Sequence, residues 1–259
     1  MIFPQIAFFD IDGTLLEFGS RKLRPLTRQA LLRLREKGCR LFLATGRAPY
    51  TLPDFQDVLF DGYLCFNGSL CFDRKGDLLY SRPMDKEAVK KVLDRAAMLD
   101  IPVMVSTAVE AAWTFCNSAL EQYARISGKP IQLLEDEEDI LKRDIYQLTA
   151  AAGENRENAL LEEISGCRTA RWRDDAVDII PADGGKVSAM VEILNHYGIG
   201  RDESIAFGDG KNDLDMIRYA GIGIAMGNAP PAVRDAADRV APDCSCDGVY
   251  RTLRELSFI

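Results

Sequence analysis

Short apolar blocks alternate with amphipathic stretches along the N-terminal part of the chain. The block at residues 6–9 is apolar and aromatic and ends abruptly at Asp10, which is typical of a buried strand. The stretch that follows has apolar positions on one helical face, with Thr27 as the expected N-cap and Gly38 as the stop. A second apolar block at 41–44 predicts another buried strand.

The same alternation returns near the C-terminal end of the sequence. Apolar blocks at 204–207 and 222–225 predict two further strands, with a short helix over 214–220 between them. A proline pair at 230–231 predicts the start of another helix. Because strand, helix and strand follow one another, we expect an α/β fold whose parallel sheet is covered by helices on both faces.

The middle of the chain has a different pattern, in which pairs of strands joined by short links alternate with helices. We expect helices at 85–99, 117–127 and 155–164, and strands at 101–106, 111–116, 145–151, 168–172 and 176–180. This mixture predicts an α+β domain, the insert (residues 83–181), within a discontinuous α/β core (residues 1–82 and 182–259). Five consecutive acidic residues at 135–139 are typical of a solvated face or of the first turn of a helix.

Composition excludes several classes of protein. The chain has 259 residues, of which 47% are hydrophobic and 28% charged, as in ordinary globular proteins. Its net charge of −8 disfavours a nucleic-acid partner, because an acidic surface repels the phosphate backbone. The seven cysteines are scattered and odd in number, which favours a reducing cytoplasm over a disulfide framework. No run of eighteen uncharged apolar residues occurs, so we expect no membrane partner.

The segment Asp10-Ile11-Asp12-Gly13-Thr14 places two carboxylates at the end of a predicted strand. Open α/β sheets bind their ligands at that edge. Residues two apart on a strand face the same way, so Asp10 and Asp12 would repel each other unless a cation or another partner lay between them. A divalent metal ion would relieve the repulsion. The alternative is an ordinary turn, in which Asp12 caps a helix.

Two further segments carry polar side chains directly after predicted strands. Thr45-Gly46-Arg47 follows the strand at 41–44 and can offer a hydroxyl and backbone amides to a phosphate. The segment at 208–213 follows the strand at 204–207 and contains two more carboxylates and an amide. Hard divalent cations take oxygen ligands, so Asp10 and Asp209 together fit a Mg²⁺ site.

Lys186 lies between two glycines and a helix expected to begin near Val187. Its ammonium group could reach a phosphate at the edge of the sheet, although an ordinary surface position is the commoner fate of a single lysine. The interpretation therefore depends on the other segments.

Taken together, these segments resemble the motifs of haloacid dehalogenase superfamily hydrolases, and among them the Cof-type phosphatases. The four motifs are matched in order by Asp10-Ile11-Asp12-Gly13-Thr14, Thr45-Gly46-Arg47, Lys186 and Gly208-Asp209-Gly210-Lys211-Asn212-Asp213. Asn67-Gly68 and the segment at 225–229 also resemble the subfamily. Val187 departs from its pattern, because Lys-Gly is usual there. The long interval between Thr45 and Lys186 implies a Rossmann-like core with a second-site α+β cap.

The resemblance implies an aspartyl-phosphate mechanism with Mg²⁺ as cofactor. Asp10 would be the nucleophile, and Asp12 the general acid and base that also lends its backbone carbonyl to the metal. Asp209 would bind the metal directly, and Asp213 would hold a metal-bound water or Lys186. The residues implied to bind phosphate or substrate are Thr45, Gly46, Arg47, Lys186 and Asn212. For Arg47, an ion pair with a core carboxylate is an equal alternative.

The substrate class implied is a small phosphorylated metabolite. Sugar phosphates are the first expectation, followed by compounds such as flavin mononucleotide and pyridoxal phosphate, and the protein would be a cytoplasmic monomer or weak homodimer. Alternatives are a phosphomutase of the same superfamily and a receiver-like phosphorylatable signalling module. A long insert and the second carboxylate, Asp12, argue against the receiver, because a regulatory phosphate needs neither a lid nor an acid for a leaving alcohol.

A few other residues could suggest chemistry but have simpler interpretations. His196, the single histidine, is expected in the last turn of a helix, and Cys244 and Cys246 are expected to be ordinary loop thiols. Trp113 and Trp172 are typical of strand packing, although aromatic residues of the insert near Arg171 and Arg173 could contact a leaving group.

Overall fold

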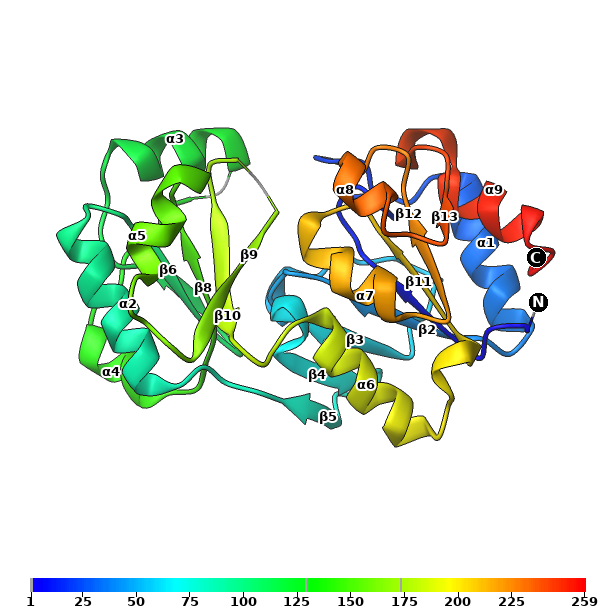
Figure 1. Ribbon diagram of the computed structural model, residues 1–259, viewed down its shortest axis with the longest axis horizontal. Coiled ribbons are helices and arrows are strands. Elements are labelled where there is room, and N and C mark those ends of the chain that lie inside the picture. The colour runs from blue at the N-terminus through cyan, green and yellow to red at the C-terminus, as the bar shows by residue number, and fades with distance from the viewer. Residues whose placement is uncertain (1, 129, 173) are drawn as a thin grey trace.

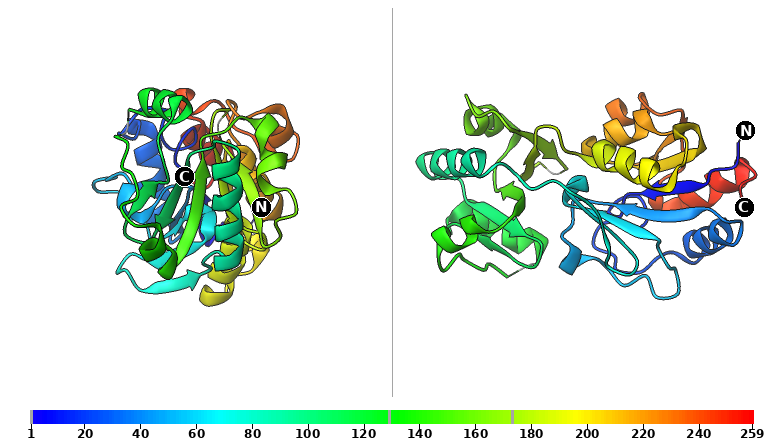
Figure 2. Two further views of the ribbon diagram at one scale, coloured as in Figure 1. Left: turned by 90° about the vertical axis from the view of Figure 1, so that its left-hand side faces the viewer. Right: turned by 90° about the horizontal axis from the view of Figure 1, so that it is seen from below.

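The computed structural model describes residues 2–128, 130–172 and 174–259, which fold around two β-sheets (Figure 1). Within these residues the larger sheet has eight strands and the smaller sheet has five. Figure 2 shows the two sheets at opposite ends of an elongated molecule. Both chain termini lie on the side of the larger sheet that is remote from the smaller one.

The larger sheet is mainly parallel. Across the sheet its strands are β13 (Arg239–Val240), β12 (Ile222–Ala225), β11 (Ser204–Gly208), β1 (Ile6–Phe9), β2 (Arg40–Ala44), β3 (Gly62–Cys65), β4 (Leu70–Asp73) and β5 (Leu78–Ser81). Neighbours from β13 to β3 pair in parallel, whereas β4 and β5 are added antiparallel at one edge. The strands predicted at 6–9, 41–44, 204–207 and 222–225 are confirmed as β1, β2, β11 and β12.

Helices cover both faces of this sheet, as predicted for an α/β fold. Ala7 and Phe9 of β1 pack on α1 (Pro25–Glu36) and α9 (Gly248–Glu255), whereas Ile6 and Phe8 face α6 (Lys186–Tyr197) and α7 (Leu214–Tyr219). Because alternate residues of a strand point to opposite faces, the continuous apolar block at 6–9 indicates burial on both sides. A short helix, α8 (Pro231–Arg234), follows β12.

The predicted N-cap of the first helix is wrong. Helix α1 begins at Pro25, and its N-cap, Arg24, makes no capping hydrogen bond through its side chain. Proline suits the first helical position because its fixed φ angle is already helical and the missing N–H would have no partner there. Thr27 therefore lies inside the first turn, where it is buried.

The smaller sheet is antiparallel and carries its own helices. Its strands are β7 (Ala111–Trp113), β6 (Val103–Thr107), β8 (Ile145–Ala150), β10 (Val177–Pro181) and β9 (Cys167–Arg171), in that order across the sheet. The helices are α2 (Lys86–Met98), α3 (Ser118–Ser127), α4 (Glu137–Lys142) and α5 (Glu157–Leu161). All these elements lie within the range 83–181, which we keep as the proposed extent of the insert.

Local predictions in this region are mostly confirmed. Helix α2 is capped by Asp85, and the acidic run supplies the N-cap and first turn of α4. The helix predicted at 155–164 is shorter, because the chain first makes a 3-10 turn over Glu154–Arg156 and leaves the helix after Leu161. Trp113 packs in a buried cluster, as expected. Arg173 lies outside the described residues.

One face of the smaller sheet is polar although it is buried. Leu148 and Ala150 of β8 pack among the apolar residues beneath the helices, whereas Gln147 and Thr149 alternate with them and are equally inaccessible to solvent. Asp178 of β10 is also buried, at 2% exposure. Buried polar groups are normally hydrogen-bonded, so this face must contact polar partners.

The remaining predictions concern His196, Cys244 and Cys246, of which Cys244 is buried. His196 is exposed in the last turn of α6, and Cys244 and Cys246 are free thiols. Within the part of the chain that the structure describes, no helix is both long enough and apolar enough to cross a membrane.

Candidate active site

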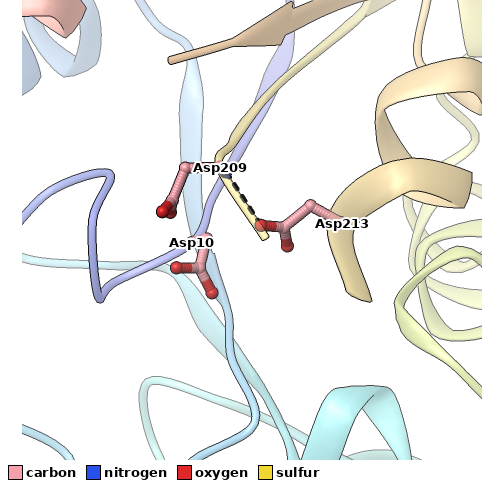
Figure 3. Close-up of side chains that lie close together, drawn as sticks. All are labelled: Asp10, Asp209 and Asp213. Carbon is pink, nitrogen blue, oxygen red and sulfur yellow. Dashed lines mark hydrogen bonds between the residues drawn. The ribbon is translucent and has the colours of Figure 1, made fainter. Parts of the chain in front are cut away.

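Three carboxylates meet at the carboxyl edge of the larger sheet (Figure 3). Asp10 follows β1 and Asp209 follows the adjacent strand β11, so parallel pairing brings the two residues to the same edge. Asp213 reaches the same point from the start of α7. Ligand oxygens of all three side chains lie within 4.8 Å of one another, and all three residues are buried. The predicted association of Asp10 with Asp209 and Asp213 is therefore present.

Lys186 joins this cluster from the first turn of α6. Its Nζ donates to Asp10 Oδ1 at 2.6 Å and to Asp213 Oδ1 at 2.5 Å, and the residue is 2% exposed. Burial alone would lower the pKa of Lys186, but the carboxylates of Asp10 and Asp213 raise it further than burial lowers it. The side chain is thus held as a buried ammonium group beside Asp10.

Asp213 also fixes the loop that carries Asp209. Its second oxygen accepts the backbone N–H of Asp209 at 2.9 Å and that of Gly210 at 2.8 Å. Because its other oxygen accepts from Lys186, both oxygens of Asp213 have donors within the protein. This arrangement suits a residue that positions a lysine and a loop.

The cluster has more negative than positive charge. Burial raises the pKa of Asp10 well above its usual range, and Asp213, Asp209 and Asp12 add to the rise while Lys186 opposes it. Burial and then Asp213 raise the pKa of Asp209 to about 7. Asp209 accepts from two neutral groups, the Thr14 hydroxyl at 3.0 Å and the Asn228 amide at 3.2 Å.

These properties fit a divalent cation. One ammonium cannot balance three buried carboxylates, and carboxylate oxygens are the ligands that Mg²⁺ prefers. Asp213 already accepts from the Lys186 ammonium and from two backbone amides. Asp10 accepts from Lys186 through one oxygen, and Asp209 accepts from two neutral groups, a hydroxyl and an amide, so these two carboxylates are better suited to hold the cation. The donor set therefore agrees with the Mg²⁺ site predicted from the sequence.

Asp12 is not one of the three clustered carboxylates, and its side chain pairs with Arg47. The Nε and Nη2 groups of Arg47 donate to the two oxygens of Asp12 at 2.7 and 2.6 Å, and its Nη1 donates to the carbonyl of Thr51 at 3.1 Å. Bonding to Asp12 raises the pKa of Arg47. Of the two alternatives left open for Arg47, the structure has the ion pair with a core carboxylate.

The Thr45-Gly46 loop lies beside this pair. Thr45 is 1% exposed, and its hydroxyl accepts the backbone N–H of Arg47 at 3.1 Å. A Cβ on Gly46 would lie 3.2 Å from both the Asn67 amide nitrogen and an Asp178 carboxylate oxygen. The insert, which carries Asp178, is therefore packed directly on the loop after β2.

A cavity of about 240 Å³ lies between the insert and the core. Lys186 and Asn212 line it from the core, and Arg168, Arg171 and Glu157 line it from the insert. The described residues around it are charged or polar apart from Gly185, Ala170 and Ile180, and none is aromatic. Of the residues predicted to bind phosphate or substrate, Lys186 and Asn212 thus share the cavity with side chains of the insert.

Sequence reasoning noticed Asn67 only as part of a subfamily resemblance, and it missed the other polar residues that connect the insert to this site. Asn67 accepts from Asn212 and donates to both Gln147 and Asp178. The sequence does contain a signal for Gln147 and Asp178, because each is a polar residue within a mainly apolar predicted strand. Thr14 and Asn228, which bind Asp209, fall within segments that were noticed but given no role.

Comparison with known proteins agrees with these features. A family profile described as haloacid dehalogenase-like hydrolase matches residues 7–253. The chain is 26% identical to 5-amino-6-(5-phospho-D-ribitylamino)uracil phosphatase YitU of Bacillus subtilis, with 97% of each chain covered. It is 29% identical to HMP-PP phosphatase of Citrobacter koseri, over 88% of this chain and 85% of that protein.

Two solved structures of phosphatases are also similar to the chain. The phosphatase BT1666 from Bacteroides thetaiotaomicron has a TM-score of 0.94 and 29% identity, with 99% of this chain and 96% of that one covered. The subclass IIB sugar phosphatase BT4131 has a TM-score of 0.89 and 28% identity, with 98% and 100% covered. The sequence motifs, the sheet order and these similarities all point to one family. The chain belongs to the haloacid dehalogenase-like hydrolases and is a Cof-type phosphatase, a phosphoric monoester hydrolase of that superfamily.

Proposed function

We propose that this phosphatase is Mg²⁺-dependent, uses Asp10 as its nucleophile and acts on small sugar phosphates. The observation that carries the proposal is the buried cluster in which Lys186 bonds to Asp10 while Asp209 lies within ligand distance on the adjacent strand. A nucleophilic carboxylate, a phosphate-binding cation and metal-ligand oxygens are the components that phosphoryl transfer through an aspartyl phosphate needs.

In the first step, an oxygen of Asp10 would attack phosphorus and the bond from phosphorus to the leaving oxygen would break. Asp12 would donate a proton to that oxygen, so that the product leaves as an alcohol. In the structure both oxygens of Asp12 accept from Arg47, so this ion pair would have to open before Asp12 could donate a proton.

In the second step, Asp12 would accept a proton from water as the water oxygen attacks phosphorus. The bond between phosphorus and Asp10 would break, which releases inorganic phosphate and regenerates the Asp10 carboxylate. Lys186, Thr45 and the Asn212 amide would bind phosphoryl oxygens in both steps. When bound by Asp10, Asp209 and the backbone carbonyl of Asp12, Mg²⁺ would offset the negative charge that carboxylates and phosphate bring together.

The cavity supports a sugar as the leaving group. Its described lining residues are charged or polar apart from Gly185, Ala170 and Ile180, which suits a leaving group rich in hydroxyl groups. A flavin or pyridoxal ring would find no aromatic surface among the described lining residues. The name of the sugar phosphatase BT4131, and the polyol chain in the substrate name of YitU, agree with this choice.

The test is phosphate release from a panel of sugar phosphates, flavin mononucleotide and pyridoxal phosphate, with Mg²⁺ and with excess EDTA. We expect sugar phosphates to be the best substrates, EDTA to abolish release, and Ca²⁺ to support it poorly because Ca²⁺ is larger and takes more ligands. Asp10→Asn, purified in parallel, controls for contaminating phosphatases.

Two results would contradict the proposal. Undiminished release in EDTA would remove Mg²⁺ from the mechanism, and a positional isomer of the sugar phosphate in place of inorganic phosphate would indicate a phosphomutase. Cytoplasmic location and a monomeric or weakly dimeric state stay predictions.

A further inference from the structure

Asn67 is the centre of a buried hydrogen-bond network between the insert and the core. The residue is 1% exposed. Its Nδ2 donates to Gln147 Oε1 at 2.9 Å and to Asp178 Oδ2 at 3.0 Å, and its Oδ1 accepts from Asn212 Nδ2 at 2.9 Å. One amide group thus binds two strands of the insert and the loop that carries Asp209 and Asp213.

The backbone around Asn67 has an unfavourable conformation. Phe66, Asn67 and Gly68 have successive φ angles of +51°, +54° and +93°. A bulky residue such as phenylalanine rarely adopts a left-handed conformation, and its cost must be met by surrounding contacts. Phe66 is buried and stacks on Tyr146 of the insert, with ring centroids 5.8 Å apart.

The contacts on the insert side use the polar face of the smaller sheet. Asp178 accepts from Asn67 through one oxygen and from the Thr149 hydroxyl, at 2.8 Å, through the other. Gln147 accepts from Asn67 and donates to the carbonyl of Gly46 at 3.2 Å. The buried polar residues of β8 and β10 are therefore directed at Asn67 and at the loop after β2.

On the core side, the network leads into the catalytic loop. Asn212 is adjacent to Asp213, which binds Lys186 and the backbone amides of Asp209 and Gly210. Asn67 also donates its own backbone N–H to the carbonyl of Thr45 at 2.8 Å. Docking of the insert and placement of the loop at 209–213 thus share one residue.

We propose that Asn67 is a positioning residue that makes the catalytic geometry of the loop at 209–213 depend on docking of the insert. With Asn67 bonded to Asp178 and Gln147, its Oδ1 is oriented toward Asn212 and restrains the loop. Without those bonds the loop gains freedom, and Asp209 and Lys186 lose their fixed relation to Asp10. Sub-ångström placement of such groups governs the rate of the chemical step.

The test swaps the donor and the acceptor of the hydrogen bond between Asn67 and Asp178. Asn67→Asp keeps the shape and tolerates the left-handed backbone, but it replaces the donor with an oxygen that faces the Asp178 carboxylate. Adding Asp178→Asn restores the bond between residues 67 and 178 in the opposite sense and leaves an acceptor for Thr149, whereas the bond to Gln147 stays broken. Asn67→Gly removes the side chain altogether and also accepts a positive φ.

The first readout is hydrogen–deuterium exchange at the amides of Asp209 and Gly210, which is independent of activity. We expect faster exchange in Asn67→Asp and Asn67→Gly, and a return toward wild type in the double variant. A change confined to β8 and β10 would mean that Asn67 only attaches the insert, and it would overturn the proposal.

The second readout is kinetic and rests on the proposed function. For Asn67→Asp and Asn67→Gly we expect kcat to fall by about tenfold or more, the scale of a misplaced catalytic group, with a smaller change in KM. The double variant should recover most of kcat. A normal kcat in Asn67→Gly would overturn the proposal, because it would mean that only the introduced repulsion was harmful.

A matched control removes a contact between insert and core that does not reach the loop. Ser81→Ala deletes the hydrogen bond between the Ser81 and Tyr146 hydroxyls, which are 3.1 Å apart. Its kcat should stay within about twofold of wild type, because a net hydrogen bond contributes little when no buried partner is stranded in the active site. If wild type released no phosphate from any substrate, the proposed function would fail, while the exchange result would still decide the role of Asn67.

Discussion

At the scale of single residues, the site depends on how closely backbone and carboxylates approach each other. Gly13 has a φ angle of +89°, and a Cβ there would lie 2.1 Å from Asp209 Oδ2. Only glycine satisfies both conditions, because it tolerates positive φ and has no Cβ. The glycine of the first motif thus leaves space for a carboxylate that the fourth motif supplies.

Gly13→Ala should therefore lose activity, and Gly19→Ala should retain it. Gly19 also has a positive φ, +82°, but a Cβ there would meet nothing within 4 Å. Both variants should be destabilised by about 1 kcal/mol from the backbone conformation alone. Thermal unfolding and phosphate release measure the two effects separately, and equal activity in the two variants would contradict the predicted clash.

Without metal, the fold should become less stable as pH rises toward neutrality. The pKa of Asp209 is raised to about 7, from a usual value of 3.8, chiefly by burial. Between these values the folded state binds more protons than the unfolded state, so the free energy of unfolding falls as pH increases. Denaturant unfolding in EDTA should show this slope, and Asp209→Asn should flatten it. A slope unchanged by the substitution would assign the effect to other groups.

At the scale of elements, most but not all of the buried strands of the larger sheet could be predicted from the sequence. Strands β1 and β12 were predicted at their observed limits, because central parallel strands are apolar throughout. Strands β3, β4 and β5 were not predicted. β4 and β5 form the antiparallel edge, β5 is largely exposed, and their mixed apolar and polar residues give only a weak pattern.

Only part of the candidate site could likewise be predicted from the sequence. Asp10 and Asp209 could be associated from the sequence because each directly follows a predicted strand, and strand ends of a parallel sheet meet at one edge. Asn67, Gln147 and Asp178 could not, because their contacts depend on how the insert docks on the core. Local periodicity carries no information about that docking.

The packing of the loop after β3 on helix α6 gives a prediction at this scale. A Cβ on Gly68 would lie 2.6 Å from the carbonyl oxygen of Gly185, the residue before Lys186. Gly68→Ala should displace the start of α6, and with it Lys186, and so lower kcat by about tenfold or more. Gly76→Ala is the control, because Gly76 has a similar φ of +91° and open space around it. Equal kcat values would show that the start of α6 tolerates the displacement.

At the scale of the whole molecule, the chain passes between the core and the insert at two places. An ion pair joins the two connecting segments. Arg82 in the first connection forms an ion pair with Asp183 in the second. Arg168 of the insert donates to the carbonyl of Gly184 at 2.8 Å, next to the loop that leads to Lys186. The insert therefore contacts the segment that leads to Lys186 as well as lining the cavity.

Exchange of the insert should change which substrate is preferred. In the proposed mechanism the core motifs bind only the phosphoryl group and the metal, which are common to the reaction of every phosphate monoester, so discrimination would come from the insert side of the cavity. Replacing residues 83–181 with the corresponding segment of a relative that prefers another substrate should reorder kcat/KM values while Mg²⁺ dependence persists. A well-folded chimera with the original ranking would instead assign specificity to Arg47 and the Asn67-Gly68 loop.

The central claim is that the phosphoryl group passes through Asp10, and the direct measurement is to find it there. Asp12→Asn retains the nucleophile but lacks the base for the second step, so the phosphoenzyme should accumulate with a substrate whose leaving group needs no proton. Rapid quenching and peptide mass spectrometry should locate one phosphoryl group on Asp10, and none should form in the Asp10→Asn, Asp12→Asn double variant. A phosphoryl group on another residue, or undiminished turnover in Asp10→Asn, would contradict the account.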